Sequence, residues 1–267
     1  MRSEGMVDFV VTGDGPFRAV LTQIALDKLR LLAIHESIAR IAYMSVPVDQ
    51  VLLAFPAAAG SQLWGGIRLQ PNELITLAPG QDLFARTERE CRWTAIWFPV
   101  QELLRYSQAL SNGPSPLLDA VTVWRPTPSA GRDLRSLHSS GIRVAHALAD
   151  AHAAHALEQR LIHALCNSLC GTATTAPNAL LRSEHEAMRR FHKLLMAGPP
   201  QSSMASSADA LHVSDRFFRH SCTHQLGMTA TGYVGLRHRQ SAGGGTSGMP
   251  PLVWPEEAYR KGEPECD

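Results

Sequence analysis

Residues 152–170 concentrate side chains that bind transition metals or react with oxidants. They are His152, His155, Glu158, His163, Cys166 and Cys170. The first two histidines lie three residues apart, so on a helix they could share a metal ion if a third ligand came from elsewhere. The segment is rich in alanine and packs readily as an ordinary helix, and a disulfide between cysteines one turn apart would constrain little. We therefore expect no metal site, no redox site and no cofactor.

Motifs of common enzyme classes are absent from the sequence. It contains no Gly-x-Ser-x-Gly, no His-Glu-x-x-His and no phosphate-binding glycine loop. The fragment VTGDGPF has two glycines but lacks the third glycine and the following helix, so it predicts a turn. The strand-like region holds one histidine, His35, which argues against a metal-dependent barrel enzyme. We expect no catalytic residues and no enzyme activity.

Three tryptophans fall on predicted strands. They are Trp64, Trp93 and Trp97; Trp93 and Trp97 are four residues apart and should share one face of a strand, pointing into the barrel. Large aromatic side chains at such positions either fill the core or line a pocket for a small-molecule effector. Both interpretations stay open, and core filling is the commoner one.

Residues 214–227 form an amphipathic helix with a basic outer side. Ser214 is a predicted N-cap and Gly227 a predicted C′ residue. The predicted inner side repeats every four residues, at Phe218, Cys222 and Leu226. A short helix with Ser203 as N-cap should precede it and cross it closely at the small Ala208. The outer side carries Asp215, Arg216, Arg219, His220, Thr223 and His224, and such a surface suits the major groove of DNA.

The run VSDRFFRHSCTHQLGMTATGYVGLRHR resembles the first helix-turn-helix and linker helix of the AraC/XylS family of transcription regulators. The similarity rests on the spacing from Ser214 to Gly227, on Gly-x-Thr at 227–229 and on Tyr-Val-x-Leu-Arg at 233–237. It covers residues 183–240 well and extends weakly over 17–170. A solvated side of some other helical bundle is the alternative interpretation of the same pattern.

The resemblance implies a partner and a set of contact residues. The partner is double-stranded promoter DNA. Arg216, Arg219 and His220 occupy positions that reach base edges in the family, and an arginine can donate two hydrogen bonds to guanine. Phosphate contacts, at most, are implied for the remaining candidates, Thr223, His224, Arg237 and Arg239. Residues 182–240 hold eight basic and four acidic side chains, which is a modest excess of the sign that DNA requires.

The sequence departs from the family pattern at three places. Ser207 stands where the family prefers a large aliphatic residue, and His212 stands at a turn position that often takes glycine. After Gln240 the chain becomes glycine- and proline-rich, with no helical period, so the second helix-turn-helix of the family is missing. This C-terminal composition is compatible with a truncation, with a reading-frame change and with a genuine variant of the family. We expect the linker helix to lose its hydrophobic partner, and DNA affinity to move toward the nonspecific range.

The pattern of the segments that would position these residues predicts an α+β fold. Short apolar segments punctuated by glycine and proline between residues 17 and 98 predict a small, cupin-like β-barrel, followed by a helix at Val100 to Leu110 and a loose connection at 111–132. From Leu134 to Leu169 the apolar period becomes helical, which predicts two helices or one bent helix. Their apolar stripe must pack on the barrel or on a second subunit, and we favour a homodimer contact. The next helix should open with a capping box of Ser183 and Glu186.

Five regions follow from this pattern: a β-rich sensor domain (1–132), dimerisation helices (133–170), a linker (171–182), the first half of a helix-turn-helix domain (183–240) and a disordered or atypical tail (241–267). The net charge is +1, hydrophobic residues make up 45% of the chain, and the five cysteines include no CxxC pair. No signal peptide and no apolar stretch of about 20 residues is present, so we expect a cytoplasmic protein with no membrane partner. The sequence predicts a sequence-specific transcription regulator. The alternative is a truncated ligand-binding or dimerising module that does not bind DNA.

Overall fold

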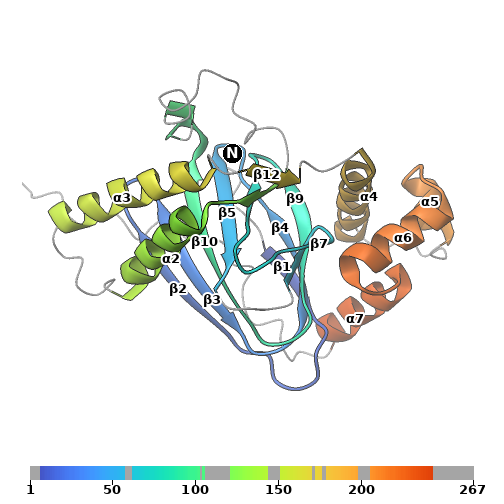
Figure 1. Cartoon of the computed structure of the whole chain (residues 1–267). Helices are drawn as coiled ribbons and strands as arrows, with labels where there is room; N and C mark the ends of the chain where they lie inside the picture. Colours follow the sequence, from blue (N-terminus) through green and yellow to red (C-terminus); the bar gives the residue numbers. More distant parts are fainter. Residues whose placement is uncertain are drawn as a thin grey trace, which may run out of the picture.

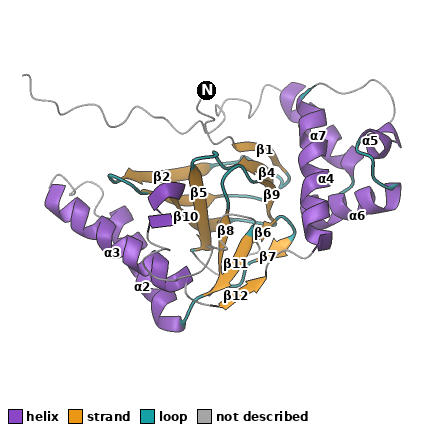
Figure 2. Cartoon of the chain, turned by 90° about the horizontal axis from the view of Figure 1, so that it is seen from above, coloured by secondary structure: helices purple, strands orange, loops and turns teal. Residues whose placement is uncertain are grey.

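The computed structural model describes residues 7–57, 62–102, 104–105, 121–143, 151–169, 172–175, 179–197 and 205–242. Two antiparallel β-sheets lie between two groups of helices (Figures 1 and 2). Helices α2 and α3 cover one sheet, and helices α4, α6 and α7 cover the other. This α+β arrangement agrees with the predicted class.

The smaller sheet, sheet A, has five strands in the order β1-β4-β9-β6-β7. Their bounds are β1 Val7–Val11, β4 Arg40–Ser45, β9 Asp82–Thr87, β6 Gln62–Trp64 and β7 Ile67–Arg68. The larger sheet, sheet B, has seven strands in the order β12-β11-β8-β5-β10-β3-β2. Their bounds are β12 Thr172–Thr175, β11 Thr122–Arg125, β8 Leu74–Leu77, β5 Gln50–Pro56, β10 Cys91–Pro99, β3 Arg30–Glu36 and β2 Ala19–Ala25.

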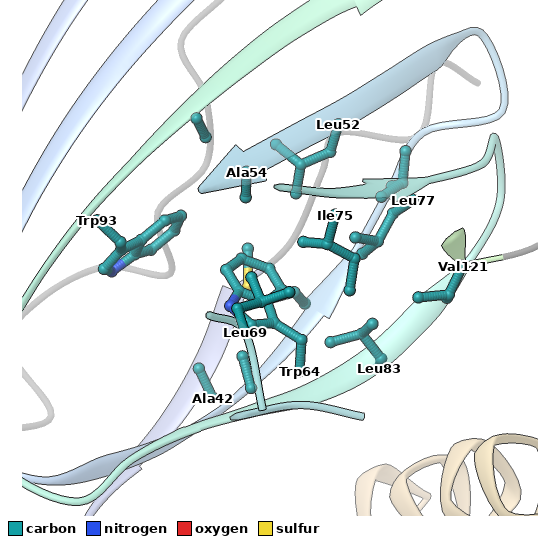
Figure 3. Close-up of a cluster of buried hydrophobic side chains, with 14 of the residues drawn as sticks. Ala42, Leu52, Ala54, Trp64, Leu69, Ile75, Leu77, Leu83, Trp93 and Val121 are labelled. Carbon is teal, nitrogen blue, oxygen red and sulfur yellow. The ribbon is translucent and has the colours of Figure 1, made fainter. Parts of the chain in front are cut away.

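The main core lies between the two sheets, where alternate residues of facing strands meet (Figure 3). Leu52 and Ala54 of β5 contribute to this cluster, and Trp64 of β6 lies within it. Trp93 and Trp97 belong to the same cluster, as their spacing predicts. The intervening residues of β10 face the helices on the other side. Because both faces of these strands are covered, they form continuous apolar runs rather than an alternating pattern.

The expected barrel is not closed, because the described pairings form two separate sheets. One reason lies at the edge strand β1. There the side chain of Gln240 accepts a hydrogen bond from the Val11 N–H at 3.1 Å and donates one to the Val11 carbonyl at 2.7 Å. A side-chain amide of the last helix thus occupies backbone groups to which another strand would pair.

Helices α2 (Pro128–Arg143) and α3 (Ala151–Leu169) pack on the outer face of sheet B. The predicted apolar stripe is buried there: Leu134, Leu161 and Leu165 are each at most 4% exposed. This intramolecular packing differs from the favoured expectation that the stripe serves a second subunit, and the homodimer remains a prediction. Glu158 is fully buried, and it accepts hydrogen bonds from the backbone N–H groups of Lys28 and Leu29 at 2.6 and 3.0 Å.

Some connecting segments are more regular than the sequence indicates. Within the expected loose connection, Thr122–Arg125 forms β11 and α2 begins at Pro128, while 111–120 lies outside the described residues. The indole of Trp124 donates to Thr76 Oγ1 at 2.9 Å, which fixes β11 against β8. Strand β12 lies inside the expected linker. Residues 100–102 and 104–105 are helical, and the rest of that expected helix lies outside the described residues.

Four helices complete the described part of the chain: α4 (Ala179–Met196), α5 (Ala205–Ala210), α6 (Asp215–Leu226) and α7 (Ala230–Ala242). The capping box predicted at the start of α4 is wrong, because the helix begins four residues before Ser183. Glu186 instead forms hydrogen bonds with Arg189 and Arg190 at 2.8 Å. Three predictions fall outside the described residues. They concern the N-cap Ser203, the side chain of Ser207 and the tail after residue 242.

Candidate nucleic-acid interface

Helix α6 has the boundaries that its sequence predicts. Ser214 is the N-cap, with φ −69° and ψ 147°, and its hydroxyl oxygen accepts a hydrogen bond from the Phe217 N–H at 3.3 Å. Gly227 ends the helix with φ 71°, and its N–H donates to the Thr223 carbonyl at 3.0 Å. A side chain at Gly227 would meet the guanidinium of Arg86 on β9, so glycine is required for space as well as for conformation.

The inner side of α6 is fixed in a core shared with α4 and α5. Phe218, Cys222 and Leu226 are at most 5% exposed, and the ring of Phe218 lies 5.2 Å from that of Phe191 on α4. Ala208 of α5 is buried, as expected where two helices cross. The turn between α5 and α6 passes through His212 at φ 53°, a left-handed conformation that histidine tolerates better than most residues.

The outer side of α6 is open to solvent. Arg216, Arg219, His220 and Thr223 are all exposed. Arg219 pairs with Asp215 one turn earlier at 2.6 Å, with both side chains more than 60% exposed, so the pair is weak and easily exchanged for another anion. The Thr223 hydroxyl donates to the Arg219 carbonyl at 3.0 Å. The helix therefore presents two arginines and one histidine that other parts of the described chain do not cover.

The fifth predicted contact, His224, is partly withdrawn from this surface. It is half-buried, and its Nδ1 lies 2.7 Å from Oε2 of Glu184 on α4. The other carboxylate oxygen of Glu184 lies 3.2 Å from His220 Nε2. Glu184 is 1% exposed and is not among the residues that the sequence predicts for the site. The spacing of the two histidines indicates that they can share a partner, but no local pattern says that the partner lies on α4.

A turn of sheet A reaches the same point. Gly65 and Gly66 join β6 to β7, and the Gly65 carbonyl lies 2.9 Å from Nε2 of His185, the residue after Glu184. A Cβ at Gly66 would lie 2.5 Å from Cε1 of His224, so the backbone of this turn lies directly against that imidazole. Burial lowers the pKa of His185 below its ordinary value.

Helix α7 is also attached to sheet A. Tyr233 is fully buried among Phe84 of β9 and Phe191 of α4. Arg237 pairs with Asp8 of β1, so this arginine is engaged by the β domain, while Arg239 is exposed. The expectation that this helix lacks a hydrophobic partner is wrong, because the outer face of sheet A supplies one.

A second group of polar side chains lies between the sheets. Arg40 is 2% exposed; its Nε donates to Glu36 Oε1 at 2.9 Å and its Nη1 to the Ala85 carbonyl at 2.7 Å. Gln62 of β6 lies two strands away, on the other side of Thr87 of β9, and Trp93 faces the guanidinium at 5.9 Å from the ring centroid. Among the described residues, neither side-chain atom of Gln62 and neither indole N–H of Trp64 and Trp93 has a protein partner. The tryptophans stand out in the sequence, whereas no local pattern marks Arg40 and Gln62.

No protein-family model and no curated protein sequence matches this chain. Among solved structures, it is similar to the AraC-like transcriptional activator CuxR, with 13% identity and a TM-score of 0.49, over 88% of this chain and 86% of that one. It is also similar to ToxT from Vibrio cholerae, with 8% identity and a TM-score of 0.25, over 89% of this chain and 80% of that one. A fatty-acid-bound ToxT gives 8% identity and a TM-score of 0.30, over 90% and 81%.

These TM-scores and identities are too low to establish a common fold. No helix of the described residues has both the length and the apolar character needed to cross a membrane.

Proposed function

We propose that this protein is a sequence-specific DNA-binding transcription regulator, with α5 and α6 as a helix-turn-helix and α6 as the recognition helix. The observation that carries the proposal is the contrast between the two sides of α6. One side is locked in a core by Phe218, Cys222 and Leu226, and the other exposes Arg216, Arg219 and His220. A rigid helix with solvent-exposed donors on one side is the geometry that enters a major groove.

The five candidate residues take different parts in this proposal. Arg216, Arg219 and His220 contact base edges, and Thr223 contacts a phosphate. The proposed role of His224 changes, because its Nδ1 is already bound to Glu184. We assign it to holding the surface in place and at most to a phosphate contact.

One recognition helix per chain gives limited affinity. With α6 as its recognition helix, each chain would insert this helix into one groove. A homodimer through helices 133–170 would bring two such helices to one duplex and recover affinity by linking the two binding events. The side of α3 turned away from sheet B, which includes His155 and His163, is exposed and available for such a contact.

DNA binding can be tested with purified protein and a duplex selected from a random-sequence pool, by fluorescence anisotropy over a salt series. We expect Arg216→Ala and Arg219→Ala each to weaken binding to the selected duplex by about 1–3 kcal/mol. The matched control is Arg143→Ala, an exposed arginine at the end of α2 on the opposite side of the molecule (Figure 1). It removes the same charge and should leave binding nearly unchanged.

The alternative function, from a different class, is a ligand-binding or dimerising module that does not recognise an operator. It predicts weak binding that salt abolishes, with equal effects of all three arginine substitutions. That result would reject the regulator.

We further propose that a small polar effector binds among Arg40, Gln62, Trp64 and Trp93. Buried polar atoms without protein partners are costly, and a ligand with both hydrogen-bond donors and acceptors would satisfy them. A screen of small polar compounds by thermal shift tests this. A true effector should raise the melting temperature of the wild type but not of Gln62→Leu.

A further inference from the structure

The buried carboxylate of Glu184 connects two imidazoles of the proposed recognition helix. Its oxygens lie 3.2 Å from His220 Nε2 and 2.7 Å from His224 Nδ1. The two rings stack one turn apart on α6, with centroids 5.9 Å apart and planes 20° from parallel. His220 is 63% exposed, whereas the Glu184 side chain is only 2% exposed. A carboxylate hidden in the protein thus lies at ion-pair distance from a side chain that faces solvent.

The contact with Glu184 determines which nitrogen of His224 carries a proton. A carboxylate only accepts hydrogen bonds, so Nδ1 of His224, which is hydrogen-bonded to it, must be the donor. Nε2 of His220 lies within ion-pair distance of the other oxygen of the same carboxylate. Because Nε2 of His220 faces Glu184, Nδ1 is the nitrogen left to meet a base edge. Without Glu184, the orientation of His220 would be free to change.

The turn between β6 and β7 of the β domain lies against the histidines next to Glu184. Gly65 and Gly66 have φ values of +55° and +83°, and their backbone contacts the imidazoles of His185 and His224. Trp64, the residue before this turn, is fully buried between the sheets against Trp93. A continuous series of contacts therefore runs from the core between the sheets through the turn to His224, Glu184 and His220.

We propose that Glu184 is a positioning residue for DNA recognition and that the β6–β7 turn controls it. Movement of β6 shifts the turn, the turn shifts the imidazole of His224, and Glu184 transmits the change to His220. The inference rests on the proposed function for its effect on DNA. The geometry of the imidazoles does not depend on that function and can be measured separately.

The first experiment observes the imidazoles by long-range proton–nitrogen NMR of the full chain without DNA. In the wild type we expect a proton on Nδ1 of His224. Glu184→Gln and Gly66→Ala should each remove the Nδ1 proton from His224 or shift its resonances. The control Gly80→Ala has a similar φ of +71°, but its new Cβ meets only Val48, at 3.6 Å, so His224 should not change. An unprotonated Nδ1 in the wild type, or unchanged resonances in Gly66→Ala, would overturn the proposal.

The second experiment measures affinity for the duplex selected by the wild type. Glu184→Gln and Gly66→Ala should weaken binding about tenfold while the salt dependence stays the same, because no phosphate contact is removed. Combining Gly66→Ala with His220→Ala should weaken binding by less than the product of the two separate effects, since both act through one imidazole. Circular dichroism establishes that each variant is folded.

The two experiments separate the possible failures. If the wild type binds no duplex selectively, the proposed function fails, and the NMR result still decides the coupling. If the wild type binds selectively and Glu184→Gln and Gly66→Ala bind as well as Gly80→Ala, the positioning role is rejected and the proposed function stands. Fully multiplicative effects of Gly66→Ala and His220→Ala would also reject the route through the turn.

Discussion

At the scale of single residues, two buried imidazoles connect stability to pH. His192 is 2% exposed and stacks on Tyr43 with ring centroids 3.6 Å apart, and neither of its ring nitrogens has a protein partner among the described residues. His138, on the buried side of α2, is 1% exposed. Burial lowers the pKa of each from 6.5 to about 4. Both rings are therefore neutral in the folded chain at pH values where they are protonated in the unfolded chain.

We expect stability to fall as the pH decreases from about 6.5 toward about 4. In this window the unfolded state binds protons that the folded state excludes, so each imidazole contributes a loss of at most about 1.4 kcal/mol per pH unit. Above this window neither group titrates, and their contribution is constant. Urea unfolding at a series of pH values measures the slope.

His192→Phe should reduce that slope and stabilise the protein at acidic pH. Phenylalanine keeps the stacking on Tyr43 and removes two polar atoms that have no partner. His155→Gln, at an exposed position of α3, is the control and should leave the slope as it is. An unchanged slope in His192→Phe would mean that His192 is not held neutral by burial.

The role of a single residue could be predicted where its partners are close to it in the sequence. The roles of Ser214 and Gly227 follow from the cap positions of one helix, and both predictions are confirmed. The role of Glu184 was not predictable, because its partner His224 lies 40 residues away on another helix. Arg40 and Gln62 were missed for the same reason: charged and amide side chains are usually exposed, and only the pairing of distant strands buries them together.

At the scale of elements, long periodic segments were predicted well and short ones were not. The apolar repeat between Leu134 and Leu169 predicts two helices or one bent helix, and the structure has two. Packing on the β domain was one of the two predicted positions for their apolar stripe, and the structure shows it against sheet B. Strands β11 and β12 have only four residues each, and Pro126 directly follows β11, so their sequences carry too little pattern to predict a strand. The separation into two sheets depends on what covers the strand edges, which the apolar pattern does not encode.

The attachment of α7 to β1 gives a prediction at this scale. Gln240→Ala removes both hydrogen bonds to Val11, which should cost about 1–2 kcal/mol and expose the edge of β1. Amide hydrogen exchange at Val11 should accelerate relative to the centre of β4. Arg239→Ala, on the exposed side of the same helix, is the control. Equal exchange in the two variants would show that Gln240 does not protect the strand edge.

At the scale of the whole molecule, the C-terminal helices do not have a core of their own. The cluster that holds them combines Phe191, Phe218 and Tyr233 of the helices with Ile41 and Phe84 of sheet A. The outer face of sheet A supplies part of the hydrophobic surface on which these helices pack. The proposed DNA-binding helices and the β domain should therefore unfold together.

Phe84→Ala tests this directly. Phe84 is 1% exposed, and the loss of its ring should destabilise the chain by about 3–5 kcal/mol. The matched control is Phe55→Ala, which is 2% exposed on the outer face of sheet B beneath α2. Both variants should lower global stability, but only Phe84→Ala should selectively accelerate amide exchange in α6 and α7 under native conditions. A fragment of residues 179–242 should show no cooperative thermal transition. Cooperative unfolding of that fragment would contradict this account, because it would show that the helices are stable without sheet A.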